Sequence, residues 1–388
     1  MARVLFISTS TNNTDTVIDS LKYLGEHEIE LVRYDKRWNE VCQQAILADP
    51  NVRTYLQMGI WPPPETREAY RQRVSMDAEI LKVAATFKPH SIMYISAWEG
   101  LFVPTHETLK KLGETAPVTH LCFDGSDPPW WPQMKVFEEK GLFALTVNID
   151  GGPFWPGAPL WSTLGRPECP KIAGLTTLTP VDPRYFEGVQ VPFNVRPYAI
   201  GYAGNAGGWI RSQLVNQMQK HKGHVFTYRG RDDHMGSYRN YCDFLRYCRV
   251  VISVPFTGSN ATTHVKGRVV EAGWAGAALL EWKNDATRHW FTPRHDFWEY
   301  DSIEDCMDAA EWLAAHPRLC EEMAQALRTK VVGEHHPRQI WNHILNWQPP
   351  KVSKGKKANA SSHPSSEAPG APGSTSAAEP VSLSAAPE

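Results

Sequence analysis

The chain has 388 residues, of which 42% are hydrophobic and 21% are charged, and its formal net charge is −2. This length is above what one hydrophobic core usually supports, so it favours two domains. The small net charge gives no support for capture of nucleic acid or anionic membranes by a strong field, although a local basic patch would be averaged away in the total.

The first segment, RVLFIS, predicts a buried strand, and its apolar run is too short for the core of a signal peptide. No run of about 18 apolar residues follows anywhere, so we predict no membrane span. The seven cysteines are scattered and form no CxxC pair, which argues against both a disulfide framework and a zinc site. We therefore expect a soluble, cytoplasmic protein with reduced thiols.

Strands and helices alternate through the first half of the chain. The apolar patterns predict a β-α-β opening, a helix over residues 67–86, a further strand, a short helix over residues 105–112, and a strand at residues 118–124. Such alternation is typical of a parallel sheet covered on both faces. The stretch 124–197 is rich in Pro, Gly and Trp and marks the end of a first domain, residues 1–195.

A second alternating series, residues 196–347, predicts another domain of the same α/β class. It includes a helix over 263–275, and it ends in helices over 302–315, 317–331 and 337–347, the last of which is free to pack back on the first domain. In the remaining residues, 348–388, 24 of the 41 are Pro, Ser or Ala, which predicts a disordered tail. Ligands of such folds usually lie at the carboxyl ends of the strands.

Two loops that follow strands are candidates for holding phosphates. Gly204 and Asn205 lie in the glycine-rich GYAGNAGGW, where backbone N–H groups at a helix start can bind an anion; the alternative is an ordinary tight turn. The spacing does not fit GxGxxG, which disfavours a nicotinamide dehydrogenase. Arg229 and Arg231 in TYRGRDD have the fork that clamps a diphosphate, and the alternative is a surface loop with local ion pairs.

The stretch VKGRVVEAGWAGAALLEW is the third candidate. Lys266 and Arg268 would lie in the first turns of the predicted helix, where cations are unfavourable unless an anion binds there. Glu271 follows, and a carboxylate beside a diphosphate site can accept both hydroxyls of a ribose. The alternative is an exposed helical glutamate.

This stretch, the segment FTPRHDFWEYDSIEDCMDAAEWL and a histidine-containing terminal helix resemble the carboxyl-terminal half of GT-B glycosyltransferases, nearest to the group related to spore-maturation glycosyltransferases. The resemblance implies two Rossmann-like doubly wound domains facing across a cleft. It further implies that Glu271 holds the donor ribose, that Lys266 and Arg268 lie near the donor phosphates, that Gly204 faces the donor, and that the small residues after Glu271 close the donor pocket. Many retaining relatives have an acidic residue where this chain has Thr263 and His264, so inversion and retention both stay open.

The resemblance also implies a metal-independent reaction without a cofactor, because fixed dipoles and basic side chains stabilise the diphosphate. If the enzyme inverts, Asp124 is the candidate base, and its alternative roles are substrate positioning and loop capping. Trp98, Trp130 and Trp131 are candidates for the acceptor site, since indole faces stack on sugars or bases; equally, they rigidify long loops. Glu99 is a further acceptor-site candidate, because it follows a strand and so points towards the cleft.

The resulting hypothesis is a glycosyltransferase that moves a sugar from a nucleotide-diphosphate sugar to an acceptor. The acceptor class is open among glycan, protein, small molecule and modified nucleobase. A nucleotide-sugar epimerase of the same fold and a non-catalytic nucleotide-binding scaffold are the alternatives.

Overall fold

The computed structural model describes residues 1–9, 12–34, 50, 76–95, 103–152, 174–188, 191–204, 206, 209–221, 226–230, 237–258 and 262–347. Residues 1–347 form one compact unit. The α/β class predicted from the sequence is confirmed, because this unit contains two parallel sheets. The domain boundary near residue 195 stays a prediction, and the tail lies outside the described residues.

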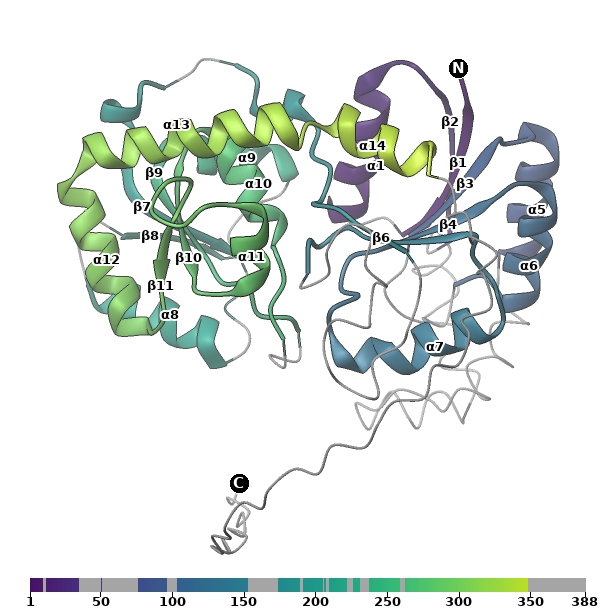
Figure 1. The fold of residues 1–388 in the computed structure, drawn as a ribbon, viewed down its shortest axis with the longest axis horizontal. Helices are drawn as coiled ribbons and strands as arrows, with labels where there is room; N and C mark the ends of the chain where they lie inside the picture. The colour runs from purple at the N-terminus through teal and green to yellow at the C-terminus, as the bar shows by residue number, and fades with distance from the viewer. Residues whose placement is uncertain are drawn as a thin grey trace, which may run out of the picture. The chain divides into compact units, whose positions relative to one another are not determined.

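The first sheet has six strands in the order β2-β1-β3-β4-β5-β6 (Figure 1). Its strands are β1 (Arg3–Ser8), β2 (Glu28–Arg33), β3 (Ser91–Ile95), β4 (Val118–Cys122), β5 (Leu145–Asn148) and β6 (Gly174–Thr176). The helices of this part of the chain are α1 (Asn12–Leu24), α5 (Asp77–Phe87), α6 (His106–Thr115) and α7 (Trp131–Glu139), with a 3-10 turn, η1, at Pro128–Trp130.

Alternate residues of β1 face two different cores, as expected for a strand buried on both sides. Leu5 and Ile7 pack with residues of α5, α6 and α7, whereas Val4 and Phe6 pack with residues of α1. The predicted helix over residues 67–86 is described only from Asp77, where α5 begins and continues to Phe87.

The second sheet has five strands in the order β11-β10-β9-β7-β8. Its strands are β7 (Tyr198–Gly204), β8 (Phe226–Gly230), β9 (Cys248–Ser253), β10 (Ala278–Trp282) and β11 (Trp298–Tyr300). Its helices are α8 (Trp209–Lys220), α9 (Tyr238–Tyr247), α10 (Gly267–Ala275), α11 (Asp285–Trp290), α12 (Ile303–Ala315) and α13 (Pro317–Glu334), and the 3-10 turns η3 (Pro183–Phe186) and η4 (Phe193–Val195) precede it.

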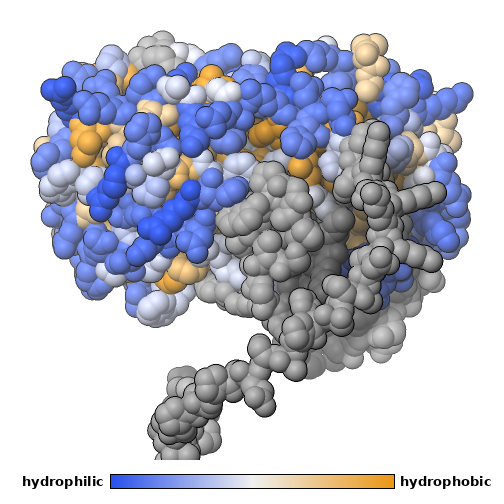
Figure 2. All heavy atoms as spheres, in the orientation of Figure 1, coloured by the Kyte–Doolittle hydropathy of each residue, from blue (hydrophilic) through white to orange (hydrophobic). Residues whose placement is uncertain are grey.

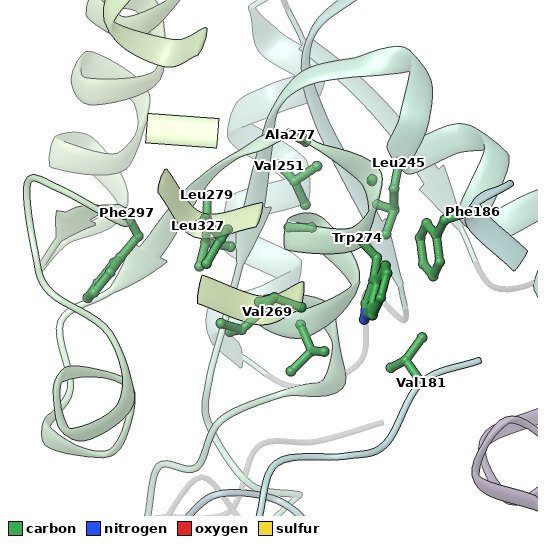
Figure 3. Close-up of a cluster of buried hydrophobic side chains, with 14 of the residues drawn as sticks. Val181, Phe186, Leu245, Val251, Val269, Trp274, Ala277, Leu279, Phe297 and Leu327 are labelled. Carbon is green, nitrogen blue, oxygen red and sulfur yellow. The ribbon is translucent and has the colours of Figure 1, made fainter. Parts of the chain in front are cut away.

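Helices cover both faces of this sheet (Figure 1). Val250 and Ile252 of β9 pack with residues of α8 and α12, whereas Val251 packs with residues of α9 and α10. Figure 3 shows the second of these clusters, in which Val269, Leu279 and Leu327 bring α10, β10 and α13 together. Helix α10 is therefore held on one side by a continuous apolar core.

The small residues after Glu271 serve this packing. A Cβ at Gly273 would lie 2.6 Å from Cγ2 of Val331, so only glycine allows α13 to come this close to α10. Gly276 ends the helix with φ +62°, the left-handed conformation that a helix C-cap often needs. In the structure this small-residue run is accounted for by helix packing and helix termination.

The last helix, α14 (Pro337–Leu345), packs against α1 of the first sheet's layer (Figure 1). Trp341 is fully buried there, its indole N–H donates to Ser20 Oγ at 2.8 Å, and its ring meets Phe6 edge-on with centroids 6.0 Å apart. The end of the described chain thus completes the core begun by its first strand.

On the face shown in Figure 2, hydrophobic side chains are scattered among hydrophilic ones over the described surface. Among the described residues, no helix is both long and apolar enough to cross a membrane.

Candidate active site

Helix α10 begins at Gly267, so the prediction of a helix from Thr263 is wrong at its start. The reason is long-range backbone pairing: the N–H of His264 donates to Pro255 O at 3.1 Å and the N–H of Val265 donates to Asp150 O at 2.8 Å. Lys266 is consequently the N-cap residue, with φ −64° and ψ 148°, and Arg268 is in the first turn. The N–H of Val269 donates to Lys266 O at 3.0 Å. The N–H groups before it, at the first two positions of α10, precede any partner within the helix, which is the usual basis of anion binding at a helix start.

Lys266 is a half-buried cation at this positively polarised helix end. Burial lowers the pKa of its ammonium to about 8, Asp124 and Asp150 oppose this effect, and Arg211 and Arg268 add to it. Within the described part of the chain, the side chain makes neither a capping hydrogen bond nor an ion pair. A bound anion would relieve both the repulsion and the missing contact.

Arg211 was not singled out from the sequence. It lies in the first turn of α8, and its guanidinium donates to Phe256 O at 2.9 Å. Its position after a strand and a glycine-rich turn was the signal that could have identified it. Arg211 and Lys266 together make the region at the carboxyl ends of the second sheet's strands locally basic.

The guanidinium of Arg268 is already bound by groups of the protein itself. Its guanidinium donates to Ala203 O and to the hydroxyl of Tyr241, and it lies 5.0 Å from the ring centroid of Tyr202. Gly204 makes room for it, because a Cβ there would lie 2.9 Å from Arg268 Nη2. These contacts join the start of α10 to the carboxyl end of β7, and they account for Gly204. Asn205 lies outside the described residues.

Glu271 is buried, with 9% of its surface exposed. The hydroxyls of Tyr238 and Tyr241 donate to its two carboxylate oxygens, each at 2.6 Å. Burial raises the pKa of the carboxyl group, and the two tyrosine hydrogen bonds oppose that rise. Each oxygen retains further lone-pair capacity, so the geometry orients the carboxylate and leaves it able to accept additional hydroxyl groups.

The two tyrosines were not predicted as site residues. They are three residues apart on α9 and so lie on one helix face, which places both hydroxyls against the same carboxylate. Arg229, a predicted phosphate ligand, is exposed on β8, the strand at one edge of the second sheet. Arg231 lies outside the described residues.

Loops of the two sheets meet beside Lys266. The hydroxyl of Thr262 donates to Ser126 O at 2.7 Å, and the indole of Trp290 donates to Gly151 O at 2.9 Å. Ser126 follows β4, Gly151 follows β5, and Thr262 follows β9. Carboxyl ends of strands from both sheets thus lie next to one another, as expected for a ligand site in doubly wound folds.

Three titratable residues are grouped at this junction. Nδ1 of His264 lies 2.9 Å from Oδ2 of Asp150 and 4.0 Å from Oδ1 of Asp124. The Asp124 side chain is 43% exposed, whereas those of His264 and Asp150 are almost completely buried. Asp150 and His264 were not proposed as site residues, because they are 114 positions apart and neither stands in a motif by itself.

The predicted aromatic acceptor residues differ in their surroundings. Trp131 is 2% exposed, packs in the core of the first sheet, and donates its indole N–H to Gly125 O at 3.2 Å. Trp130 is half-buried in η1. Trp98 and Glu99 lie outside the described residues. Among the described residues, no cluster of three or more His, Cys, Asp or Glu side chains is arranged to hold a metal ion.

Glu281 on β10 is a second buried acid of this half of the chain. Its Oε1 accepts from the Asn284 amide at 3.3 Å, and its Oε2 has no hydrogen-bond partner in the described structure. Burial raises the pKa of Glu281 to about 7. The carboxyl group is therefore a proton-binding group near neutral pH.

Comparison with known proteins relates this architecture to a class of enzymes. Residues 211–346 match a family model described as glycosyl transferase-like. A search of curated proteins finds no match.

Solved structures of other proteins align with most of the chain. HepE of Anabaena, in complex with UDP-glucose, has a TM-score of 0.52 and 11% identity, over 89% of this chain and 98% of that chain. Sucrose-phosphate synthase of Thermosynechococcus elongatus has a TM-score of 0.54 and 11% identity, over 89% and 99%. An alpha-glucosyltransferase in complex with UDP-glucose and DNA containing an abasic site has a TM-score of 0.53 and 10% identity, over 89% and 98%.

The narrower resemblance to the spore-maturation group stays a prediction. The protein has the GT-B fold of glycosyltransferases, and its residues 211–346 match the glycosyl transferase-like family.

Proposed function

We propose that the protein transfers a glycosyl group from a nucleotide-diphosphate sugar to an acceptor hydroxyl or related nucleophile. The observation that carries the proposal is the ammonium of Lys266 at the start of α10, which has no ion-pair partner among the described residues and stands five positions before the buried carboxylate of Glu271. A nucleoside diphosphate offers a partner to each of these groups: its diphosphate to Lys266, and the two hydroxyls of its ribose to Glu271. Two proteins of similar fold are described in complex with UDP-glucose, which supports this donor class.

In this proposal, the diphosphate lies against Lys266 and the first N–H groups of α10. Arg211 adds positive charge, and Arg268 holds the end of β7 in place. These groups stabilise the charge that develops on the leaving diphosphate, so the protein's own dipoles and cations take the role that a metal has in other transferases. Gly204, the last residue of β7, lies next to Arg268. Metal independence is part of the proposal.

Glu271 accepts hydrogen bonds from the donor ribose. The hydroxyls of Tyr238 and Tyr241 already orient its carboxylate at 2.6 Å, so little reorganisation is needed when the ribose binds.

The five described cysteines are all buried and unpaired, which fits the cytoplasmic location expected from the sequence.

The test is a panel of UDP-glucose, UDP-galactose, UDP-N-acetylglucosamine and GDP-mannose. Thermal shift measures binding, and release of free nucleoside diphosphate measures turnover. We expect one of these donors to stabilise the fold and to be consumed, with and without a metal chelator. If none of them stabilises the protein or is consumed, the proposed function is refuted. Conversion of the donor into another nucleotide sugar without release of nucleotide would instead indicate an epimerase.

Glu271→Gln tests the ribose contact. Loss of a charged acceptor that serves two hydroxyls is expected to weaken donor binding by about tenfold or more, because hydrogen bonds to charged groups contribute about 1.5–3 kcal/mol. The control is Glu299→Gln, which removes a carboxylate of the same sheet that pairs with Arg288 at 2.6 Å and has no role in the donor site. Unchanged donor affinity in Glu271→Gln would remove the assigned role.

A further inference from the structure

His264, next to the proposed donor site, has one ring nitrogen without a hydrogen-bond partner among the described residues. The imidazole is 2% exposed, and its Nε2 atom is buried without a hydrogen-bond partner in the described part of the chain. A buried polar atom without a partner destabilises the fold, so such an atom in a native structure points to a ligand or to a chemical role. The residue stands two positions before Lys266, at the junction of the two sheets.

The other ring nitrogen is held firmly. Nδ1 lies 2.9 Å from Oδ2 of Asp150, whose side chain is also almost completely buried. Oδ1 of Asp150 accepts from the N–H of Gly152 at 2.9 Å and from the hydroxyl of Ser126 at 3.3 Å. These two hydrogen bonds orient the Asp150 carboxylate independently of the imidazole. Backbone hydrogen bonds hold the residues on either side of Asp150, from Ile149 to Cys122 and from Gly151 to Thr177.

This arrangement selects one form of the neutral imidazole. A carboxylate at Nδ1 accepts a hydrogen bond, so the proton of the ring belongs on Nδ1 and the lone pair on Nε2. The group that satisfies such a nitrogen is a hydroxyl or water that donates to it. The same carboxylate also stabilises the ring after it has gained a second proton.

We propose that His264 is the general base of the transfer reaction and that Asp150 is its positioning residue; this inference rests on the proposed function. The acceptor oxygen attacks C1 of the donor sugar while its proton passes to Nε2 of His264. The bond from C1 to the diphosphate oxygen breaks, and the nucleoside diphosphate leaves with the bonding electron pair, beside Lys266 and the start of α10. His264 then releases its proton to solvent. One displacement of this kind inverts C1.

The assignment favours His264 over Asp124, the base expected from the sequence. Asp124 lies 4.0 Å from Nδ1 of the same imidazole, so it adds negative charge on the side that is already held by Asp150. The carboxylates of Asp124 and Asp150, which lie near Nδ1, also act on the charge of Lys266, two positions further along the chain.

The experiment uses the full chain and the nucleotide sugar from the panel that stabilises it most. Donor affinity is measured by calorimetry, and nucleotide release is measured with water as the acceptor. His264→Gly is expected to keep donor affinity within about threefold and to lose nucleotide release by about 100-fold or more, the usual range for a general base. Added imidazole should restore part of the release.

Asp150→Asn is the decisive variant for positioning. An asparagine amide that donates to Nδ1 selects the other tautomer, with the proton on Nε2, so release should fall although the ring stays in place. The control is His295→Gln, which removes the histidine of another Asp–His pair. Nδ1 of His295 lies 2.7 Å from Asp296, and the His295 side chain is 71% exposed. It should leave both affinity and release unchanged.

The outcomes separate the two proposals. Normal release in His264→Gly, or parallel loss of donor affinity and release without rescue by imidazole, would overturn the assignment while the donor site stands. Retention of configuration at C1 would overturn it as well. A wild-type protein that binds a donor but never releases nucleotide contradicts catalysis by His264 and leaves binding intact. A wild-type protein that binds no donor refutes the proposed function, and the base assignment with it.

Discussion

Replacement of Lys266 by methionine should stabilise the free protein and weaken donor binding. The pKa of Lys266 falls from 10.5 to about 8 because its charge is buried, and the positive charges of Arg211 and Arg268 add to this effect. This difference corresponds to about 3 kcal/mol at about 1.36 kcal/mol per pH unit. Because part of the side chain is exposed, we expect Lys266→Met to recover about 2 kcal/mol at pH 7.

The pH dependence follows from proton linkage. Between pH 8 and 10.5 the unfolded chain keeps the proton on Lys266 and the folded chain has released it, so wild-type stability rises with pH in this range. The penalty of the buried charge is complete below about pH 8. Urea unfolding should therefore show the advantage of Lys266→Met at pH 7, and little of it at pH 10.

Donor binding should change in the opposite direction. Loss of a charged contact to the diphosphate costs about 1.5–3 kcal/mol, or about 10- to 150-fold in the affinity for UDP. Lys330→Met is the matched control, because it removes a half-buried lysine that lies 3.5 Å from Asp296; it should destabilise the protein and leave UDP affinity unchanged. Destabilisation by Lys266→Met at pH 7, or unchanged affinity for UDP, would refute the reasoning.

Three further predictions concern stability, measured by urea unfolding. The folded state keeps a proton on Glu281 up to about pH 7 and the unfolded chain loses it near 4.5, so Glu281→Gln should gain about 2–3 kcal/mol over wild type between pH 5 and 7.5; a constant difference would contradict the pKa shift. Trp341→Ala should cost about 3–5 kcal/mol, and a cost below about 1 would mean that α14 is dispensable. Gly273→Ala should cost about 1–3 kcal/mol through the clash with α13, whereas Gly113→Ala, with open space around it, should be neutral or stabilising.

The sheets and most helices could be predicted because their signals are local. The alternation of apolar strands and amphipathic helices indicated two parallel sheets, and the three final helices were placed within a few residues of α12, α13 and α14. The start of α10 was missed because Val265 bonds to Asp150, a partner 115 positions away that no local pattern reveals. Helix propensity alone would continue the helix upstream.

The candidate site was predictable only in part for the same reason. A motif could indicate Glu271 and Lys266 as chemically unusual, yet the hydroxyls that orient Glu271 come from α9, about 30 residues earlier. The pairing of His264 with Asp150 requires loops from two sheets to meet. Trp131 shows the opposite case: a tryptophan in a proline-rich loop looks available for stacking, whereas its ring is needed to fill the core.

Helix α14 has a consequence for the order in which the protein matures. Strand β1 and helix α1 leave the ribosome first, but the indole that covers Phe6 and bonds to Ser20 is translated more than 300 residues later. Residues of α1 pack on this side of the sheet early, but the part of the core that α14 supplies is added only after nearly all of residues 1–347 have been synthesised. A chain truncated before residue 337 would lack α14 and would leave the apolar surface around Phe6 without this cover.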